Sequence, residues 1–351
     1  LGSSAAAFTA ATLLSPDASA CCPAPPEGKP VVNADQTVII VWDSATKTQH
    51  FIRQASFKGA SDDFGFLIPT PTEPELNESG DAAFPLLAKI TAPKVVPRPP
   101  EPRGCSGGCS EKGADDSAVA QAPVRVLSEK AVAGFNATVL EASSTDALVG
   151  WLKERGYAFS PEVAAWAKPY VDGGWKITAL RVARKAGDSG PIDAKALRMT
   201  FKADRPLFPY REPAPPQADA MGDMKSRLLR IYFLSDGRYG GTLTPEVPWT
   251  GKVAWSGKVE GDRLKPITEA LGISALAAAT EWWLTEFEDP WPYKLAPADL
   301  YFSKADVQDG VERPPVYGAV GGGKSEVGYA LVAAALLPIA RRLGRSRPTG
   351  A

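Results

Sequence analysis

The residues closest to a catalytic pattern are two carboxylates in the last quarter of the chain. Glu286 and Glu288 lie in the segment Trp282–Trp291, with the sequence WWLTEFEDPW. At a spacing of two, both side chains would lie on one face of a β-strand. A pair of carboxyl groups can hydrolyse glycosides by acid/base chemistry, and exposed tryptophans beside them can stack on sugars. The alternative is ordinary packing, with the tryptophans in the core and the acids in solvent.

The single histidine, His50, narrows the chemistry further. A zinc site built from two or three histidines is excluded, and a Ser-His-Asp or Cys-His arrangement would have to use His50. No neighbouring residue in the sequence completes such an arrangement. We therefore expect His50 to have a structural role, at the start of a hairpin strand.

Four cysteines form the next group: Cys21, Cys22, Cys105 and Cys109. An even number in an exported chain favours disulfides, and we expect the N-terminal pair to bridge to the segment that holds Cys105 and Cys109. The connectivity stays open, because four cysteines allow three pairings. The alternative is a thiolate site for a soft metal such as copper(I). Lipidation of Cys21 would leave an odd number and weaken the disulfide prediction.

Two further motifs are weighed against their context. Gly318–Ser325, with the sequence GAVGGGKS, matches the phosphate-binding pattern G-x-x-x-x-G-K-[ST], but Arg313–Tyr317 before it cannot form the buried strand that the pattern needs. We therefore expect no nucleotide site there. Asp306–Glu312 is acidic but lacks the alternating ligands of a calcium loop, so we expect a solvated turn. No cofactor or metal is predicted for the chain.

Composition excludes one class of partner and indicates the kind of fold. The chain has 351 residues with 39 Lys+Arg and 40 Asp+Glu, a formal net charge of −1, which gives no basic excess for binding nucleic acid. Its 33 prolines and 32 glycines favour many strands and turns over a helical bundle.

The elements predicted from apolar periodicity are strands in runs, interrupted by pairs of helices. This pattern predicts an α+β fold of mostly antiparallel sheets with a few packed helices. Strands are expected at 38–42, 50–57, 64–69, 124–127, 135–140, 175–182, 197–202 and 228–234, helices at 82–91, 145–155 and 161–171, and mixed helix at 267–285. In the second helix Thr145 is the expected N-cap and Gly156 the stop.

These segments resemble a known bacterial family. The order is a cysteine pair, ADQTVIIVWD, DFGFLIPTPTEPEL, AAFPLLAKITAP, a cysteine-bearing loop and DALVGWLKERGY, from Cys21 to Phe208. Together they are similar to the family called domain of unknown function 2330. The resemblance implies an exported protein, often with a C-terminal apolar helix, and brings no catalytic residue or cofactor.

Both ends of the chain carry apolar segments. Leu1–Leu14 is apolar and small, and Ala18-Ser19-Ala20 precedes Cys21, which is typical of a signal peptide and its cleavage site. Val327–Ala340 is apolar and arginines follow it, which favours a membrane anchor with the body outside. Its fourteen residues would span roughly 21 Å as a helix, less than the ~30 Å hydrocarbon core. The alternatives are an Ala-rich tail at the N-terminus and a terminal helix docked on the body.

The sequence thus predicts a membrane-associated protein of the bacterial cell envelope that serves as a non-enzymatic binding or assembly module. Its expected partners are the membrane, through the C-terminal helix, and other envelope proteins. The predicted parts are a signal-peptide remnant at 1–20, an N-terminal α+β domain at 21–92 and 124–210, a Cys/Pro-rich loop at 93–123, a linker at 211–225, a β-rich part at 226–312, a Gly/Pro hinge at 313–326 and an anchor helix with an Arg-rich tail at 327–351. The alternatives are the envelope glycan hydrolase and the thiolate metal-binding protein.

Overall fold

The structure is a computed structural model of the whole chain. It describes residues 22–24, 31–32, 36–53, 58–59, 65–97, 124–157, 161–182, 195–213, 228–273, 281–290 and 296–318. The chain divides into a large unit, residues 1–93 and 107–314, and a small unit, residues 94–106 and 315–351. In the small unit, β8 (Val95–Pro97) pairs in parallel with β19 (Val316–Gly318).

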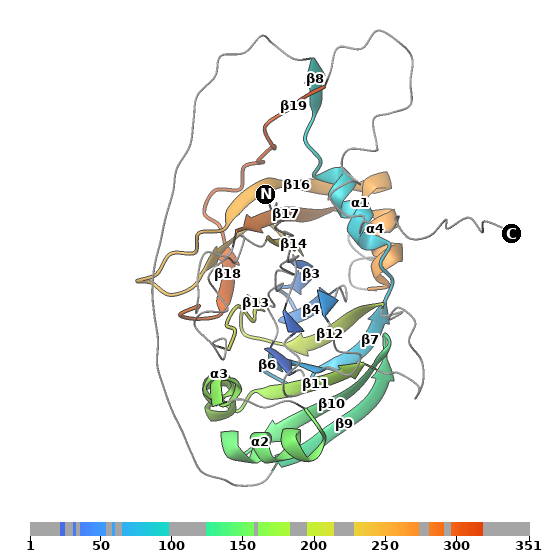
Figure 1. Cartoon of the computed structure of the whole chain (residues 1–351). Coiled ribbons are helices and arrows are strands. Elements are labelled where there is room, and N and C mark those ends of the chain that lie inside the picture. The colour runs from blue at the N-terminus through green and yellow to red at the C-terminus, as the bar shows by residue number, and fades with distance from the viewer. Residues whose placement is uncertain are drawn as a thin grey trace, which may run out of the picture. The chain divides into compact units, whose positions relative to one another are not determined.

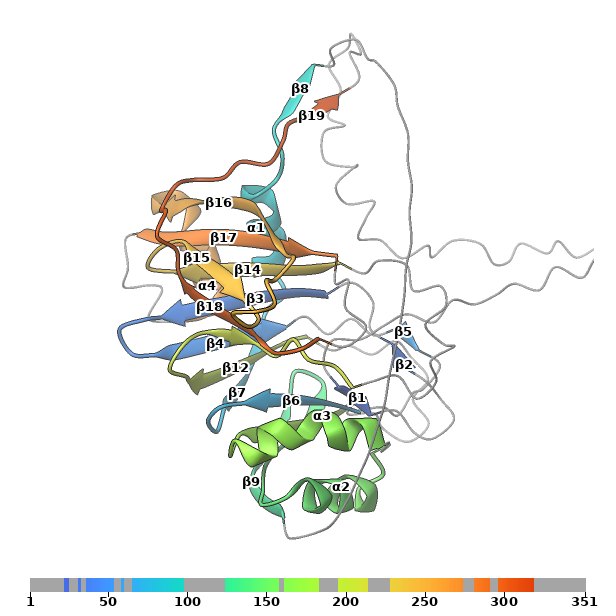
Figure 2. The same ribbon diagram turned by 90° about the vertical axis from the view of Figure 1, so that its left-hand side faces the viewer.

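A seven-stranded sheet is the largest element of the large unit (Figures 1 and 2). Its strands, in spatial order, are β16 (Lys252–Glu260), β17 (Glu281–Asp289), β14 (Leu229–Ser235), β3 (Gln36–Asp43), β4 (Thr48–Arg53), β12 (Ala196–Lys202) and β7 (Glu75–Ser79). Neighbours are antiparallel except β14 and β3, which are parallel. The sheet therefore joins strands from both sides of the predicted linker at 211–225.

Three smaller sheets complete the large unit. A five-stranded antiparallel sheet has the order β1 (Cys22–Ala24), β6 (Gly65–Thr70), β11 (Lys176–Val182), β10 (Phe135–Ala142) and β9 (Val124–Val132). A three-stranded sheet has the order β13 (Leu207–Phe208), β18 (Leu300–Lys304) and β15 (Tyr239–Thr242). A short pair joins β2 (Val31–Val32) to β5 (Lys58–Gly59).

The main core lies between the facing sides of these sheets. Side chains alternate along each strand, so one face of β3 and β4 contributes Val38, Ile40 and Phe51 to this core. The five-stranded sheet contributes Phe66 and Phe135 to the same cluster. Gln49 ties the three-stranded sheet to β4, because its buried amide donates to the carbonyl of Leu207 and accepts from the amide N–H of Leu207, both at 2.8 Å.

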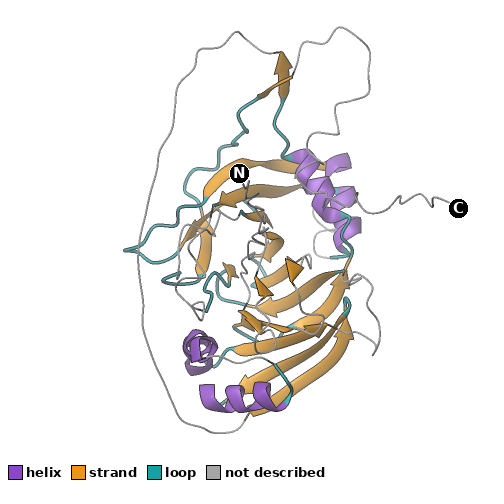
Figure 3. Ribbon diagram, in the orientation of Figure 1, coloured by secondary structure: helices purple, strands orange, loops and turns teal. Residues whose placement is uncertain are grey.

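Helices cover the outer faces of the two large sheets, in two groups that Figure 3 shows in purple. Against the seven-stranded sheet lie α1 (Ala83–Ile90) and α4 (Lys265–Leu271), with η2 (Gly261–Arg263) before α4. Against the five-stranded sheet lie α2 (Thr145–Glu154) and α3 (Pro161–Asp172). The large unit is thus an α+β arrangement of mostly antiparallel sheets, as the sequence predicts.

Helix ends follow from local chemistry, with one shift from expectation. The N-cap of α2 is Ser144, one residue before the predicted Thr145, and its side chain accepts a hydrogen bond from the Ala147 amide at 3.2 Å. Gly156 ends the segment with φ +71°, a left-handed conformation that glycine adopts without strain.

The predicted mixed helix at 267–285 is wrong in its second half. Helix α4 ends at Leu271, Gly272 follows in the left-handed region, and Glu281–Asp289 forms β17. The aromatic and β-branched residues after Glu281 fit a pleated sheet better than a helix.

The predicted anchor helix at 327–340 and the signal-peptide remnant at 1–20 lie outside the described residues. Among the helices that the structure does describe, none combines the length and apolarity that a membrane crossing requires.

Candidate functional site

The predicted acid pair lies on β17, on the outward face of the seven-stranded sheet. Glu286 is directly opposite Tyr232 of β14, and Glu288 is opposite Arg230. Only 1% of the Glu286 side chain is exposed, against 26% for Glu288. The two carboxylates therefore do share one face of a strand, but one of them is fully removed from solvent.

Two arginines neutralise these carboxylates, and we call Arg230, Glu286, Glu288 and Arg313 the Glu–Arg cluster. Glu288 Oε1 accepts hydrogen bonds from Arg230 Nη2 at 2.8 Å and from Arg313 Nη2 at 2.7 Å. Glu286 Oε1 lies 2.7 Å from Arg313 Nη2 and 2.7 Å from Arg230 Nε, the latter an ion pair without hydrogen-bond alignment. Two negative and two positive charges balance, which makes burial of the group tolerable.

Contacts within the cluster favour the charged forms of Glu288 and Arg313. Burial by itself would raise the pKa of Glu288, but hydrogen bonds from Arg313 and Arg230 lower that pKa overall. The pKa of Arg313 is raised, because its contacts with Glu288 and Glu286 outweigh the burial that would lower it. Glu288 is therefore ionised at neutral pH and cannot serve as the proton donor that glycoside hydrolysis needs.

The neighbouring tryptophans pack against protein. Trp282 is 8% exposed and belongs to the core beneath α1 and α4. Trp283 is half-buried, and its Nε1 donates to Ser256 Oγ at 2.7 Å. Trp291 lies outside the described residues. Core packing is therefore confirmed for Trp282, which cannot form an open platform for a sugar. The other half of that alternative, acids in solvent, is wrong for Glu286, because only 1% of its side chain is exposed.

Two buried aspartates that the sequence analysis missed form a second polar group. Asp289 Oδ2 accepts from Tyr210 Oη at 2.5 Å and from Trp249 Nε1 at 2.8 Å. Asp299 Oδ1 accepts from Tyr170 Oη at 2.8 Å and from the amides of Tyr210 and Arg211 at 3.0 and 3.2 Å. An acidic residue at an inward position of a strand, as Asp289 is on β17, is the sequence signal that could have revealed the first of them.

The acid–base properties of Asp299 reflect its surroundings. Burial raises the pKa of Asp299, although hydrogen bonds from Tyr170 and from the backbone of Arg211 and Tyr210 oppose the shift. The same burial, with the Asp299 charge, raises the pKa of Tyr170 well above its usual value. These groups join α3 to the segment after β13.

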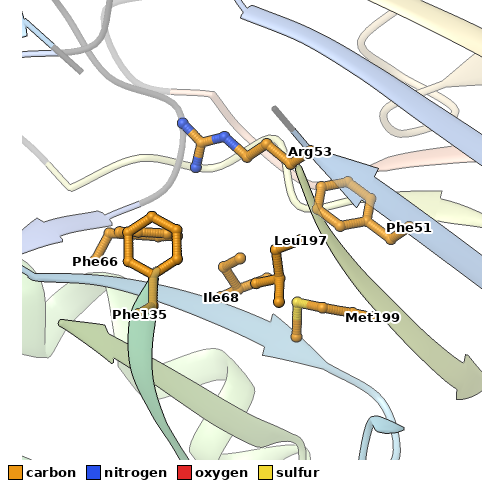
Figure 4. Close-up of a pocket in the computed structure, with 7 residues that line it drawn as sticks. All are labelled: Phe51, Arg53, Phe66, Ile68, Phe135, Leu197 and Met199. Atoms are coloured by element: carbon orange, nitrogen blue, oxygen red, sulfur yellow. The ribbon is translucent and has the colours of Figure 1, made fainter. Parts of the chain in front are cut away.

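A small cavity lies in the main core, between the two large sheets. Its volume is about 10 Å³, and its lining residues are Phe51, Arg53, Phe66, Ile68, Phe135, Leu197 and Met199. Figure 4 shows the Arg53 guanidinium near the rings of Phe66 and Phe135, and its Cζ lies 5.3 Å from the centre of the Phe66 ring. A space of this size holds one water molecule at most, so it is not a substrate site as it stands.

His50 is half-buried on β4, and its Nδ1 lies 2.9 Å from Thr200 Oγ1 of β12. Burial, and then the charge of Arg198, lower the pKa of His50 to about 4. Its ring is therefore neutral at pH 7. The contact with the Thr200 hydroxyl joins β4 to the neighbouring β12, which fits the structural role that the sequence predicts.

The remaining candidates are placed only in part. Cys22 lies on β1 opposite Leu67, whereas Cys21, Cys105 and Cys109 are outside the described residues, so the disulfides stay a prediction. Of the GAVGGGKS motif, Gly318 alone is described. The acidic turn Asp306–Glu312 is largely exposed, as expected. Within the described ranges no group of three or more His, Cys, Asp or Glu side chains could hold a metal ion.

These observations define a class: an α+β protein of helix-covered sheets in which two arginines match the candidate acid pair. The family follows from sequence. The model of DUF2330, described as "uncharacterized protein conserved in bacteria", matches residues 15–302, so the chain belongs to this family. The resemblance given from Cys21 to Phe208 is confirmed and extends almost to the end of β18.

Comparison of folds finds two solved structures of one viral protein. Baculovirus P35 matches with a TM-score of 0.35 and 8% identity, over 84% of this chain and 100% of that one. A mutated baculovirus P35 after caspase cleavage matches with a TM-score of 0.33 and 6% identity, over 79% of this chain and 98% of that one. Scores this low carry no conclusion about function. No curated protein matches the sequence.

Proposed function

We propose that this protein is an exported component of the bacterial envelope, held at the membrane, whose α+β body serves as a non-enzymatic binding or assembly module. The observation that carries the non-enzymatic part is the Glu–Arg cluster. The acid pair that the sequence analysis singled out is matched by Arg230 and Arg313, and Glu286 is 1% exposed.

Support for the location comes from the sequence. The segment before Cys21 has the composition of a signal peptide, and the apolar run Val327–Ala340 with the arginines after it has that of an anchor whose tail is cytoplasmic. Four cysteines fit an oxidising compartment.

The structure of the α+β body supports binding through its surface rather than through an internal site. Its polar side chains at the candidate positions are used in internal contacts, and the enclosed cavity in its core has a volume of about 10 Å³. We expect a rigid body of this kind to bind other molecules through its outer surface. The expected partners are proteins or cell-wall components.

Cell fractionation tests the location. We expect the natural gene product to sediment with membranes, and a variant that stops at Ser325 to appear in the soluble extracytoplasmic fraction. Thiol titration of the native protein should detect no free cysteine. Recovery of the intact protein in the cytosol with reduced thiols would overturn the proposal.

Turnover assays test the non-enzymatic part. Glu286→Gln and Glu288→Gln, alone and together, should leave any glycan-hydrolysing activity of the purified protein at the wild-type level, which we expect to be background. Activity that the double substitution abolishes, in a protein that remains folded, would restore the hydrolase alternative.

A further inference from the structure

The segment after β18 is fastened to the body at separate points and contributes nothing to the core. We call Ala305–Arg313 the strap. Most of its residues are exposed, including Val307 at 57%, and none of them belongs to a hydrophobic cluster of the described residues. A segment without buried apolar area depends on its polar contacts to stay in place.

The first fastening is at the start of the strap. Gln308 Oε1 accepts from the Arg238 amide at 2.7 Å, and Gln308 Nε2 donates to the Arg238 carbonyl at 3.0 Å. Arg238 Nη1 also donates to the Asp309 carbonyl at 3.1 Å. These groups are exposed and compete with water, so their net contribution to stability is small.

The second fastening is to the edge of the seven-stranded sheet. Val311 and Ser256 exchange two backbone hydrogen bonds, both 2.8 Å, in an isolated antiparallel bridge. The strap thereby covers one position on the free edge of β16, a strand of nine residues. An uncovered edge strand of this length is a template for another extended segment.

The third fastening is Arg313, which reaches the carboxylates of Glu286 and Glu288. It lies two residues after Val311, and two residues of extended chain span roughly 7 Å. Without its guanidinium, two carboxylates would share Arg230 alone, one of them 1% exposed. Among the described residues Glu286 Oε2 has no hydrogen-bond partner, so this carboxylate depends on the arginines for its stabilisation.

We propose that the strap is releasable, that Arg313 is its latch, and that the site it vacates binds an extended peptide segment carrying an arginine two residues after the residue that pairs with Ser256. The edge of β16 forms backbone hydrogen bonds with the peptide. The carboxylates of Glu286 and Glu288 bind the guanidinium of its arginine. In the closed state the chain's own Val311-Glu312-Arg313 occupies the site. This inference does not depend on the location proposed above.

Hydrogen exchange of the full chain tests the latch. In Arg313→Gln, the amides of Ser256 and Val311 should exchange at least tenfold faster than in the wild type, while those of Ile231 and Phe233 in β14 keep their rates. The matched control is Arg125→Gln, which removes an exposed ion pair with Glu141 at 3.5 Å and should change neither set. Unchanged exchange at Ser256 and Val311, or equal acceleration in β14, would overturn the proposal.

Arg313→Lys keeps the test decisive if Arg313→Gln does not fold. Lysine retains the charge but cannot contact both carboxylates in the same way. It should accelerate the Ser256 and Val311 amides selectively, by less than Arg313→Gln does. Wild-type rates in this variant would contradict a latch.

A peptide with the sequence of residues 305–316, ADVQDGVERPPV, tests the vacated site. By fluorescence anisotropy it should bind the Arg313→Gln protein, or the Arg313→Lys protein in its place, at least tenfold more tightly than the wild type. The same peptide with glutamine for its arginine should bind neither. Equal binding of the two peptides, or no binding to the opened protein, would show that no such acceptor site forms.

Discussion

At the scale of single residues, position on the strand decides what a carboxylate can do. Glu286 and Glu288 have a spacing that suits catalysis, yet Arg230 lies opposite Glu288 on β14 and Arg313 reaches both. The pair was visible in the sequence, whereas the arginines that neutralise it come from 56 residues earlier (286 − 230) and 27 residues later (313 − 286). Charge balance within the Glu–Arg cluster is therefore a property of the fold.

The first prediction concerns the unequal burial of these carboxylates. Glu286→Gln should destabilise the protein by about 3 kcal/mol or more, because it leaves two partly buried guanidinium charges with Glu288 as their one remaining carboxylate in the cluster. Glu288→Gln should cost about 1 kcal/mol, since its carboxylate is partly solvated. Urea denaturation measures both. If Glu288→Gln lowered the free energy of unfolding more than Glu286→Gln does, burial of the carboxylate would not explain the difference between the two substitutions.

His50 gives a prediction for the pH dependence of stability. Its pKa is lowered to about 4 in the folded protein, against about 6.5 for an unperturbed histidine. Between these values the unfolded chain binds the extra proton, so the His50 contribution is complete above pH 6.5 and is lost as the pH falls toward 4. The full loss is at most about 3 kcal/mol, and partial exposure of the ring reduces it.

Since His50 is the only histidine of the chain, the test is direct. The free energy of unfolding of the wild type, measured by urea denaturation from pH 7 to pH 5, should fall more steeply than that of His50→Gln. Parallel curves for the two proteins would rule out a depressed pKa for this ring.

At the scale of elements, periodicity predicted the parts that pack locally. The strands at 38–42 and 228–234 and the helices at 82–91 and 161–171 are confirmed within two residues by β3, β14, α1 and α3. Short strands such as β7 and β15 were missed, because a few residues carry too little alternation to detect. The change from α4 to β17 was missed because apolar residues continue through both elements.

The two buried aspartates act between elements, and Asp299 yields the third prediction. Its Oδ1 accepts from Tyr170 on α3 and from two backbone amides after β13. Asn offers the same acceptor without the charge, so Asp299→Asn should change stability by no more than about 1 kcal/mol. Asp299→Ala leaves three donors without this acceptor and should cost about 3 kcal/mol or more.

Thermal unfolding of the two Asp299 variants, with the wild type beside them, measures this difference. The comparison separates hydrogen bonding from charge, because the two replacements share the loss of charge and differ in the acceptor. Equal destabilisation by Asn and Ala would mean that the buried charge itself holds α3 to the segment after β13.

At the scale of the whole large unit, the parallel pair β14–β3 joins the two halves of the seven-stranded sheet. Residues before 211 and after 225 were predicted as separate parts, but they join in one sheet through this pair and share one core, which holds Phe51 and Phe233. Residues far apart in sequence form this pairing, and no local pattern predicts long-range pairing. Neither part alone can bury the faces that they share.

The fourth prediction is that the two parts are interdependent. A fragment that ends at Pro213 keeps β3 but loses β14, so the apolar run Val38–Val41 becomes an exposed edge strand, a hazard for aggregation. A fragment that begins at Leu228 loses the same contacts from the other side. We expect each fragment to be insoluble or unfolded when expressed alone, and the two to copurify as a 1:1 complex with the circular dichroism of the intact protein when coexpressed.

A soluble first fragment with native-like circular dichroism would instead establish 21–210 as an independent domain. It would also show that the β14–β3 pairing is a contact between finished domains rather than a requirement for folding.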